Sequence, residues 1–145
     1  MRDRLYENVP YRVPEIEHRY GPGVHLLADP FALHLLARLG ARETIQPAVN
    51  RLTVDIYRSL ARTVLSAEFP RTVADVPTRM SDRSPDGVWR GQVIDPATRA
   101  VTVNIARAGA VPSHTVYDLL NEVLDPRLVR QDHIVMSRRL GEGDH

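Results

Sequence analysis

Two arginines, Arg107 and Arg138, each follow a short apolar segment that is typical of a β-strand. Before Arg107, valine and isoleucine alternate with threonine and asparagine, and residues 133–136 before Arg138 are mostly apolar. Ligands of an open parallel sheet bind at the carboxyl ends of its strands, so both guanidinium groups are expected at one edge. Two such groups would suit a phosphate or pyrophosphate. The sequence therefore predicts an anion site at these two arginines.

The residues after Arg107 add to this prediction. Ala108 and Gly109 have little or no side chain, so backbone N–H groups there can approach an anion closely. A helix is expected to begin at Pro112-Ser113 with Ser113 as its cap, and its amino end adds a partial positive charge. A simpler interpretation stays open, in which Arg107 pairs with a carboxylate and Gly109 only turns the chain. Spacing alone does not separate the two.

One βαβ unit is expected to carry this site. A strand that ends at Arg107, a helix that ends at Asp125-Pro126 and a strand over residues 133–136 follow one another at suitable lengths. Crossovers between parallel strands are almost always right-handed. The predicted fold class is α/β with a partial parallel sheet. So small a sheet would leave open edges and an uncovered face, so we expect that residues beyond this chain or a partner subunit complete it.

The first part of the chain is predicted to be an arm and two helices. Residues 1–24 contain three prolines and a Gly-Pro-Gly cluster, which is typical of an extended arm. Asp29-Pro30 and Gly40 mark the start and end of a short helix. A longer amphipathic helix is expected between residues 44 and 70, with its apolar stripe packed in the core rather than bound to a partner. The short helix is expected to bury Phe31, Leu33, Leu35, Leu36 and Leu39.

Composition limits the classes of function. The 145 residues are 43% hydrophobic and 26% charged, as in an ordinary soluble domain. A formal net charge of +1 offers nucleic acid no broad electrostatic attraction, and no apolar run approaches the roughly 20 residues of a membrane span. The absence of cysteine removes disulfides and thiolate nucleophiles and fits a reducing compartment. We therefore expect a cytoplasmic protein with no nucleic-acid or membrane partner.

The histidines do not indicate a metal site or a catalytic residue. The six histidines have no metal-binding spacing, so no metal site of the protein's own is expected. Asp132-His133, at the expected start of a strand, could do acid–base work but is interpreted as a capping or surface pair. No catalytic residue is assigned.

The segment Ile105-Ala106-Arg107-Ala108-Gly109, followed by a helix and then by Val135-Met136-Ser137-Arg138, resembles the uracil phosphoribosyltransferases. In that family one strand ends in Ile-Leu-Arg-Ala-Gly and the next in Met-Tyr-Arg, and both contact the pyrophosphate of phosphoribosyl pyrophosphate (PRPP). The upstream order, from His25 through two helices and a β-arm, is similar as well. The resemblance implies that Arg107, Ala108, Gly109 and Arg138 bind pyrophosphate, and that residues 25–145 are the N-terminal part of a phosphoribosyltransferase-like domain.

The same resemblance implies an activity. The parent enzyme would transfer phosphoribosyl from PRPP to uracil, with magnesium and as a homodimer or higher homo-oligomer, and would give UMP and pyrophosphate. The family's ribose-phosphate loop, an acidic residue followed by Ala-Thr-Gly-Gly-Ser, has no counterpart after Arg138, so full activity is expected to need residues beyond this chain. Asn104, Ala106 and Ser137 replace the family's proline, leucine and tyrosine. The alternative is a non-catalytic anion-binding or interaction subunit.

One segment imitates the missing loop. Residues 93–98 read Val-Ile-Asp-Pro-Ala-Thr, but they precede the Arg107 strand, and Arg99-Ala100 stand where glycines would be needed. Because Asp-Pro is common in turns, we expect a hairpin turn here, at the end of a β-arm that runs from Val73 to Asp95.

Overall fold

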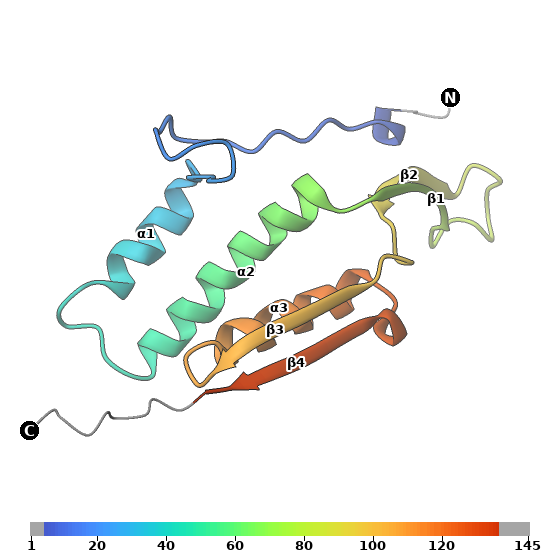
Figure 1. Ribbon diagram of the computed structural model, residues 1–145. Coiled ribbons are helices and arrows are strands. Elements are labelled where there is room, and N and C mark those ends of the chain that lie inside the picture. Colours follow the sequence, from blue (N-terminus) through green and yellow to red (C-terminus); the bar gives the residue numbers. More distant parts are fainter. Residues whose placement is uncertain (1–4, 137–145) are drawn as a thin grey trace, which may run out of the picture.

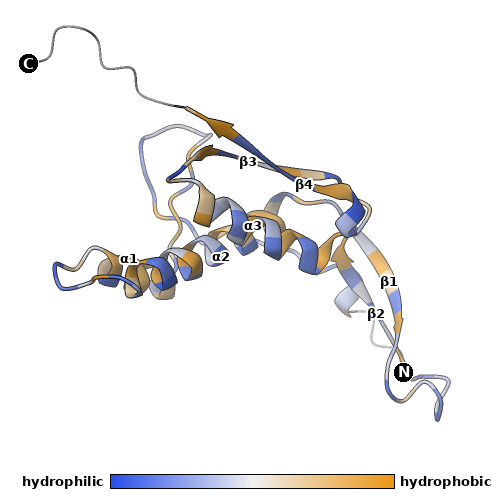
Figure 2. Ribbon diagram, turned by 90° about the horizontal axis from the view of Figure 1, so that it is seen from below, coloured by the Kyte–Doolittle hydropathy of each residue, from blue (hydrophilic) through white to orange (hydrophobic). Residues whose placement is uncertain are grey.

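The computed structural model describes residues 5–136 and gives a mixed α/β chain. Three helices lie side by side in one layer, and two strands lie on one face of that layer (Figure 1, Figure 2). The helices are α1 (Pro30–Leu39), α2 (Ala48–Glu68) and α3 (Ala110–Val123). The two strands are β3 (Ala100–Ala106) and β4 (Val129–Val135). A separate arm contains β1 (Arg71–Pro77) and β2 (Val88–Ile94), and short 3-10 turns span Leu5–Glu7 and Pro126–Leu128.

The predicted βαβ unit is confirmed, with one boundary corrected. Strands β3 and β4 pair in parallel, from Ala100 opposite Val129 to Ala106 opposite Val135, and α3 joins them. The second strand was expected over residues 133–136, yet it begins four residues earlier. Backbone pairing with β3 holds the polar residues 130–132 in the strand, which apolar periodicity alone does not reveal.

The hydrophobic core lies between the helices and the start of β4. Leu120 of α3 is 4% exposed and Leu65 of α2 is 5% exposed. The other buried members of this cluster are Ala61, Leu119, Leu124 and Val129. The stripe of the long helix therefore packs in the core as predicted over one part of its length, whereas Val64 and Ile45 are exposed.

Helix α1 begins and ends as predicted, but its buried side is smaller than expected. The Asp29 Oδ1 atom accepts hydrogen bonds from the backbone N–H groups of Phe31 (3.0 Å) and Ala32 (3.2 Å). Of the five residues expected to be buried, Leu35 is buried, whereas Phe31 is 67% and Leu36 is 54% exposed. The reason is that α1 contacts mainly α2, so only one narrow stripe of α1 is covered.

The two faces of the β3–β4 pair differ in an unusual way. Side chains on a strand alternate between faces, and the buried Asn104 lies on the α3 side. Val101, Val103 and Ile105 point to the opposite side and are 56–57% exposed. Parallel sheets are usually covered by apolar packing on both faces. Here β3 alone has an apolar outward side, because Arg130 and Asp132 of β4 share the outward face with Val101 and Val103, and Asn104 lies on the covered face.

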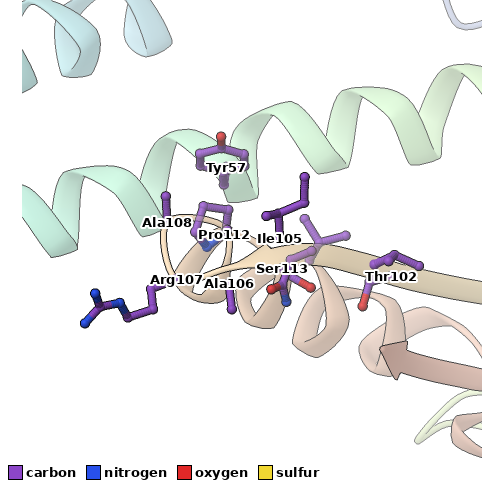
Figure 3. Close-up of a pocket in the computed structure, with 12 residues that line it drawn as sticks. Tyr57, Thr102, Ile105, Ala106, Arg107, Ala108, Pro112 and Ser113 are labelled. Carbon is purple, nitrogen blue, oxygen red and sulfur yellow. The ribbon is translucent and has the colours of Figure 1, made fainter. Parts of the chain in front are cut away.

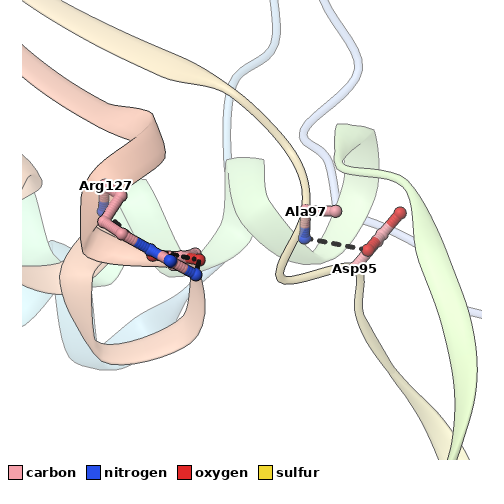
Figure 4. Close-up of polar contacts among 4 residues, drawn as sticks. Asp95, Ala97 and Arg127 are labelled. Carbon is pink, nitrogen blue, oxygen red and sulfur yellow. Dashed lines mark hydrogen bonds and ion pairs between the residues drawn. The ribbon is translucent and has the colours of Figure 1, made fainter.

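The β-arm is confirmed, but its connection to β3 is not a hairpin. Strands β1 and β2 pair antiparallel, whereas β2 and β3 belong to different sheets. The turn between them is closed by Asp95, whose Oδ1 accepts from the Ala97 N–H at 3.0 Å (Figure 4). Asp-Pro chemistry therefore predicted the turn correctly and the pairing wrongly. None of the helices within residues 5–136 combines the length and apolar character needed to cross a membrane.

Candidate anion-binding site

The loop Arg107–Gly109 joins the carboxyl end of β3 directly to the amino end of α3. The Gly109 N–H donates to the Ile105 carbonyl at 3.2 Å, and the Ala110 N–H donates to the Arg107 carbonyl at 3.1 Å. A Cβ atom on Gly109 would lie 2.9 Å from the Asn104 Cβ and 3.1 Å from the Ile105 carbonyl oxygen. The φ angle of Gly109 is an ordinary −77°, so close packing rather than backbone conformation requires glycine here.

The Arg107 side chain is exposed and has no ion pair or side-chain hydrogen bond within the described residues. Its guanidinium group extends away from the loop (Figure 3). The simpler interpretation, in which a carboxylate holds this arginine, therefore has no support within residues 5–136. An arginine placed in this way can meet an anion that approaches the loop.

Ser113 is not the cap of α3, which corrects the prediction. The helix begins at Ala110, with Gly109 in the N-cap position and no side chain that caps it. Pro112 is then the third helical residue, where the missing N–H leaves no intrahelical bond unmade. Ser113 lies inside the helix at 8% exposure, and its Oγ accepts a hydrogen bond from Gln131 Nε2 at 3.1 Å.

A groove of about 660 Å³ follows the loop. It is lined by the carboxyl half of β3, the loop and the first turn of α3, and Tyr57 of α2 completes it. Figure 3 shows Tyr57 on α2, next to Ala108 and Pro112, which line the same groove. This contribution could not be predicted from the sequence, because Tyr57 is separated from the loop by 50 residues and belongs to another helix.

A polar pair that the sequence did not connect lies under the loop. Asn104 is 6% exposed, and its Nδ2 donates to Nδ1 of His133 at 2.7 Å, whereas its Oδ1 has no partner within the described residues. His133 is in the middle of β4, directly opposite Asn104. The expected strand start at Asp132-His133 is therefore wrong, whereas both residues are exposed, as the interpretation as a surface pair requires. Asp132 points to the other face and pairs with Arg130 at 3.3 Å.

The second predicted arginine, Arg138, lies outside the described residues. The register places Val135, the last residue of β4, beside Ala106 at the end of β3. Arg107, Ala108 and Gly109 are therefore the site residues that can be described, and Tyr57 and Asn104 join them. Within residues 5–136 no group of three or more His, Asp or Glu side chains could hold a metal ion.

The clearly shifted pKa values belong to groups away from the groove. Arg127 hydrogen-bonds the Asp125 carboxylate through its guanidinium and backbone N–H, and these bonds lower the pKa of Asp125 from 3.8 to about 2 (Figure 4). In the β-arm, a hydrogen bond and the charge of Asp75, with Glu7 adding to them, raise the pKa of Arg90. Neither pair lines the groove.

Comparison with known proteins adds no assignment. A scan against protein-family models matches no family, and a search of curated proteins finds no similar sequence. The chemistry of this chain is therefore argued from its residues and their geometry.

Proposed function

We propose that this chain binds the pyrophosphate group of PRPP at the loop Arg107–Gly109 and acts as part of a uracil phosphoribosyltransferase-like enzyme. The observation that supports this most is an exposed arginine without a side-chain partner among residues 5–136, placed with two small residues between the carboxyl end of a parallel strand and the amino end of a helix. Both of these positions favour anions. The acceptor, uracil, comes from the sequence resemblance alone.

In the proposed reaction, uracil displaces pyrophosphate from PRPP and UMP forms. Negative charge grows on the departing pyrophosphate, and Arg107, with Arg138 as its proposed second arginine, would stabilise that charge. The Ala108 N–H and the amino end of α3 would add dipoles that need no rearrangement during the reaction. The chain's part in catalysis would therefore be electrostatic and would need no side-chain base.

Magnesium would enter with the donor. Mg²⁺ commonly binds through substrate phosphates and one or two carboxylates rather than in an all-protein cage. The described residues that line the groove include no acidic side chain, so they would supply no carboxylate and the phosphates of the donor would hold the ion there. We also propose a cytoplasmic homodimer or higher homo-oligomer.

The test is donor binding, measured by titration calorimetry with PRPP and Mg²⁺. Removing one charge-assisted contact in Arg107→Ala should weaken binding by roughly tenfold or more. Arg99→Ala is the matched control, because Arg99 is an exposed arginine at the opposite end of the same strand and changes the net charge equally. Equal affinity in wild type and Arg107→Ala would remove Arg107 from the site. An equal loss of PRPP affinity in both variants would mean that the net charge of the protein, and not the position of Arg107, determines the affinity.

The alternative is a non-catalytic anion-binding subunit that uses the same loop. Two departures from the family pattern, at Asn104 and Ala106, favour it. Both residues lie at the end of β3 next to the loop, and they share one face of the strand. Pyrophosphate release upon addition of uracil separates the two functions when it is measured with the residues expected beyond this chain present. PRPP binding that depends on Arg107 but yields no pyrophosphate with uracil would favour the subunit.

A further inference from the structure

Asn104 lies directly beside Gly109 of the proposed anion-binding loop. A Cβ atom on Gly109 would lie 2.9 Å from the Asn104 Cβ, and both residues line the groove with Arg107. The Nδ2 atom points at His133 on β4, so the oxygen on the other arm of the planar amide points away from β4. This Oδ1 atom is buried without a partner in the described part of the chain. A buried acceptor left unpaired is unfavourable, and such atoms are few in proteins.

We propose that Asn104 is a positioning residue for the anion, and that the proton on His133 decides which arm of the Asn104 carboxamide faces the groove. The inference rests on the proposed anion-binding function of the loop. It adds a residue that the resemblance does not supply, since the family has proline at this position.

The chemistry follows from the donors and acceptors of the two side chains. In the structure Nδ2 donates to Nδ1 of His133, so Nδ1 carries no proton and the carbonyl oxygen of Asn104 faces the groove side. When Nδ1 gains a proton it becomes a donor and needs an acceptor, which Oδ1 provides once the carboxamide turns over. The Nδ2 group then replaces the oxygen on the groove side. An anion would meet a donor there instead of an acceptor.

Among residues 5–136, none of the other titratable groups near His133 forms a hydrogen bond or ion pair with the Asn104–His133 pair. Strand β3 contributes none, since its seven residues are Ala, Val, Thr, Val, Asn, Ile and Ala. On β4, Asp132 points to the opposite face and pairs with Arg130. On α3, His114 and Asp118 pair with each other at 3.6 Å in a second groove beside α2. Tyr117 of α3 packs against the core.

The first experiment measures sulfate affinity against pH by NMR on the ¹⁵N-labelled full chain. Sulfate keeps its charge over the range in which imidazoles titrate, so any pH dependence belongs to the protein. In wild type the affinity should rise roughly tenfold as the pH falls from about 8 to about 5.5. His133→Gln, whose amide does not titrate, should lose this dependence. The matched control His114→Gln should keep it.

A third variant separates positioning from simple charge. Asn104→Leu has a similar shape and leaves His133 able to gain a proton, so a purely coulombic effect of His133 would survive in it. The inference expects the pH dependence to disappear instead. Survival of the full dependence in Asn104→Leu, its persistence in His133→Gln or its loss in His114→Gln would each overturn the inference.

A second measurement needs no anion. The Asn104 side-chain NH₂ signals should shift with pH in step with the His133 ring signals, and should stop shifting in His133→Gln. Signals that ignore the His133 titration would overturn the inference even where sulfate binds, and even if Asn104→Leu does not fold. If wild type binds neither sulfate nor PRPP at any pH, the proposed function fails and the anion part of the inference fails with it.

Discussion

Replacing Gly109 with alanine would place a methyl group against the floor of the loop. The new Cβ would lie 2.9 Å from the Asn104 Cβ and 3.1 Å from the Ile105 carbonyl oxygen, and ordinary contacts at such atoms begin near 3.4 Å. Part of the strain falls on the backbone of β3, which is paired with β4 and cannot move freely. The loop would therefore shift outward by several tenths of an ångström.

The magnitude follows from two opposing effects. Overpacking by one methyl group typically costs about 1–3 kcal/mol. Against this, alanine reduces the freedom of the unfolded chain, which contributes about 0.4–1 kcal/mol in its favour. We expect Gly109→Ala to lower the free energy of unfolding by about 1–2 kcal/mol, and to weaken anion binding because the N–H groups of the loop move with it.

Gly40→Ala is the matched control, because Gly40 has nearly the same backbone angles (φ −81°, ψ −5°) as Gly109 (φ −77°, ψ −5°). At Gly40 the nearest atom to a new Cβ is 3.6 Å away. This substitution should be neutral or slightly stabilising. Urea unfolding followed by circular dichroism measures both variants. Gly109→Ala as stable as wild type, or Gly40→Ala equally destabilised, would refute the reasoning from close packing.

Two further predictions concern stability and pH. Leu120 is 4% exposed in the core, so Leu120→Ala should lower the free energy of unfolding by about 2–5 kcal/mol. Leu36 is 54% exposed, so Leu36→Ala should lower it by less than about 1 kcal/mol. Urea unfolding compares the two variants, and similar losses of stability would contradict the assigned core. Arg127→Ala should raise the pKa of Asp125 from about 2 back toward 3.8, as followed by carboxyl ¹³C NMR. Because the folded pKa of Asp125 is the lower one, its stabilisation is present above about pH 3.8 and is lost as the pH falls toward 2, so wild type and Arg127→Ala should converge in stability at the acid end. A pKa of Asp125 that does not change in Arg127→Ala would show that the guanidinium is not the cause.

Local signals in the sequence predicted local features well. Asp29-Pro30 and Gly40 bounded α1 correctly, because capping depends on residues that are close along the chain. Ser113 failed as a cap for a related reason: Gly109 already ends the loop, and Pro112 fits equally well as the third helical residue as it does as the first. Residues 109–113 contain several signals for the start of a helix, and the packing of the loop against Asn104 determines where α3 begins.

Burial was predicted less well than helix formation. Leu33, Leu35 and Leu36 all look like core residues in the sequence, yet only Leu35 is buried. An apolar stripe shows which side of a helix can be covered, but the width that is covered depends on how many neighbours pack there, and α1 has mainly one. The valines of β3 show the same limit, because they are apolar residues of a strand and are nevertheless exposed.

The sequence by itself determined that a strand ending in Arg-Ala-Gly leads into a helix and then into a second strand, because alternation, periodicity and turn residues act over a few positions. Only the tertiary structure decided that Asn104 faces His133 across 29 residues and that Tyr57 reaches the loop from another helix. Those contacts depend on strand register and helix packing, which are set by the free energy of the whole fold and leave no mark at either residue alone.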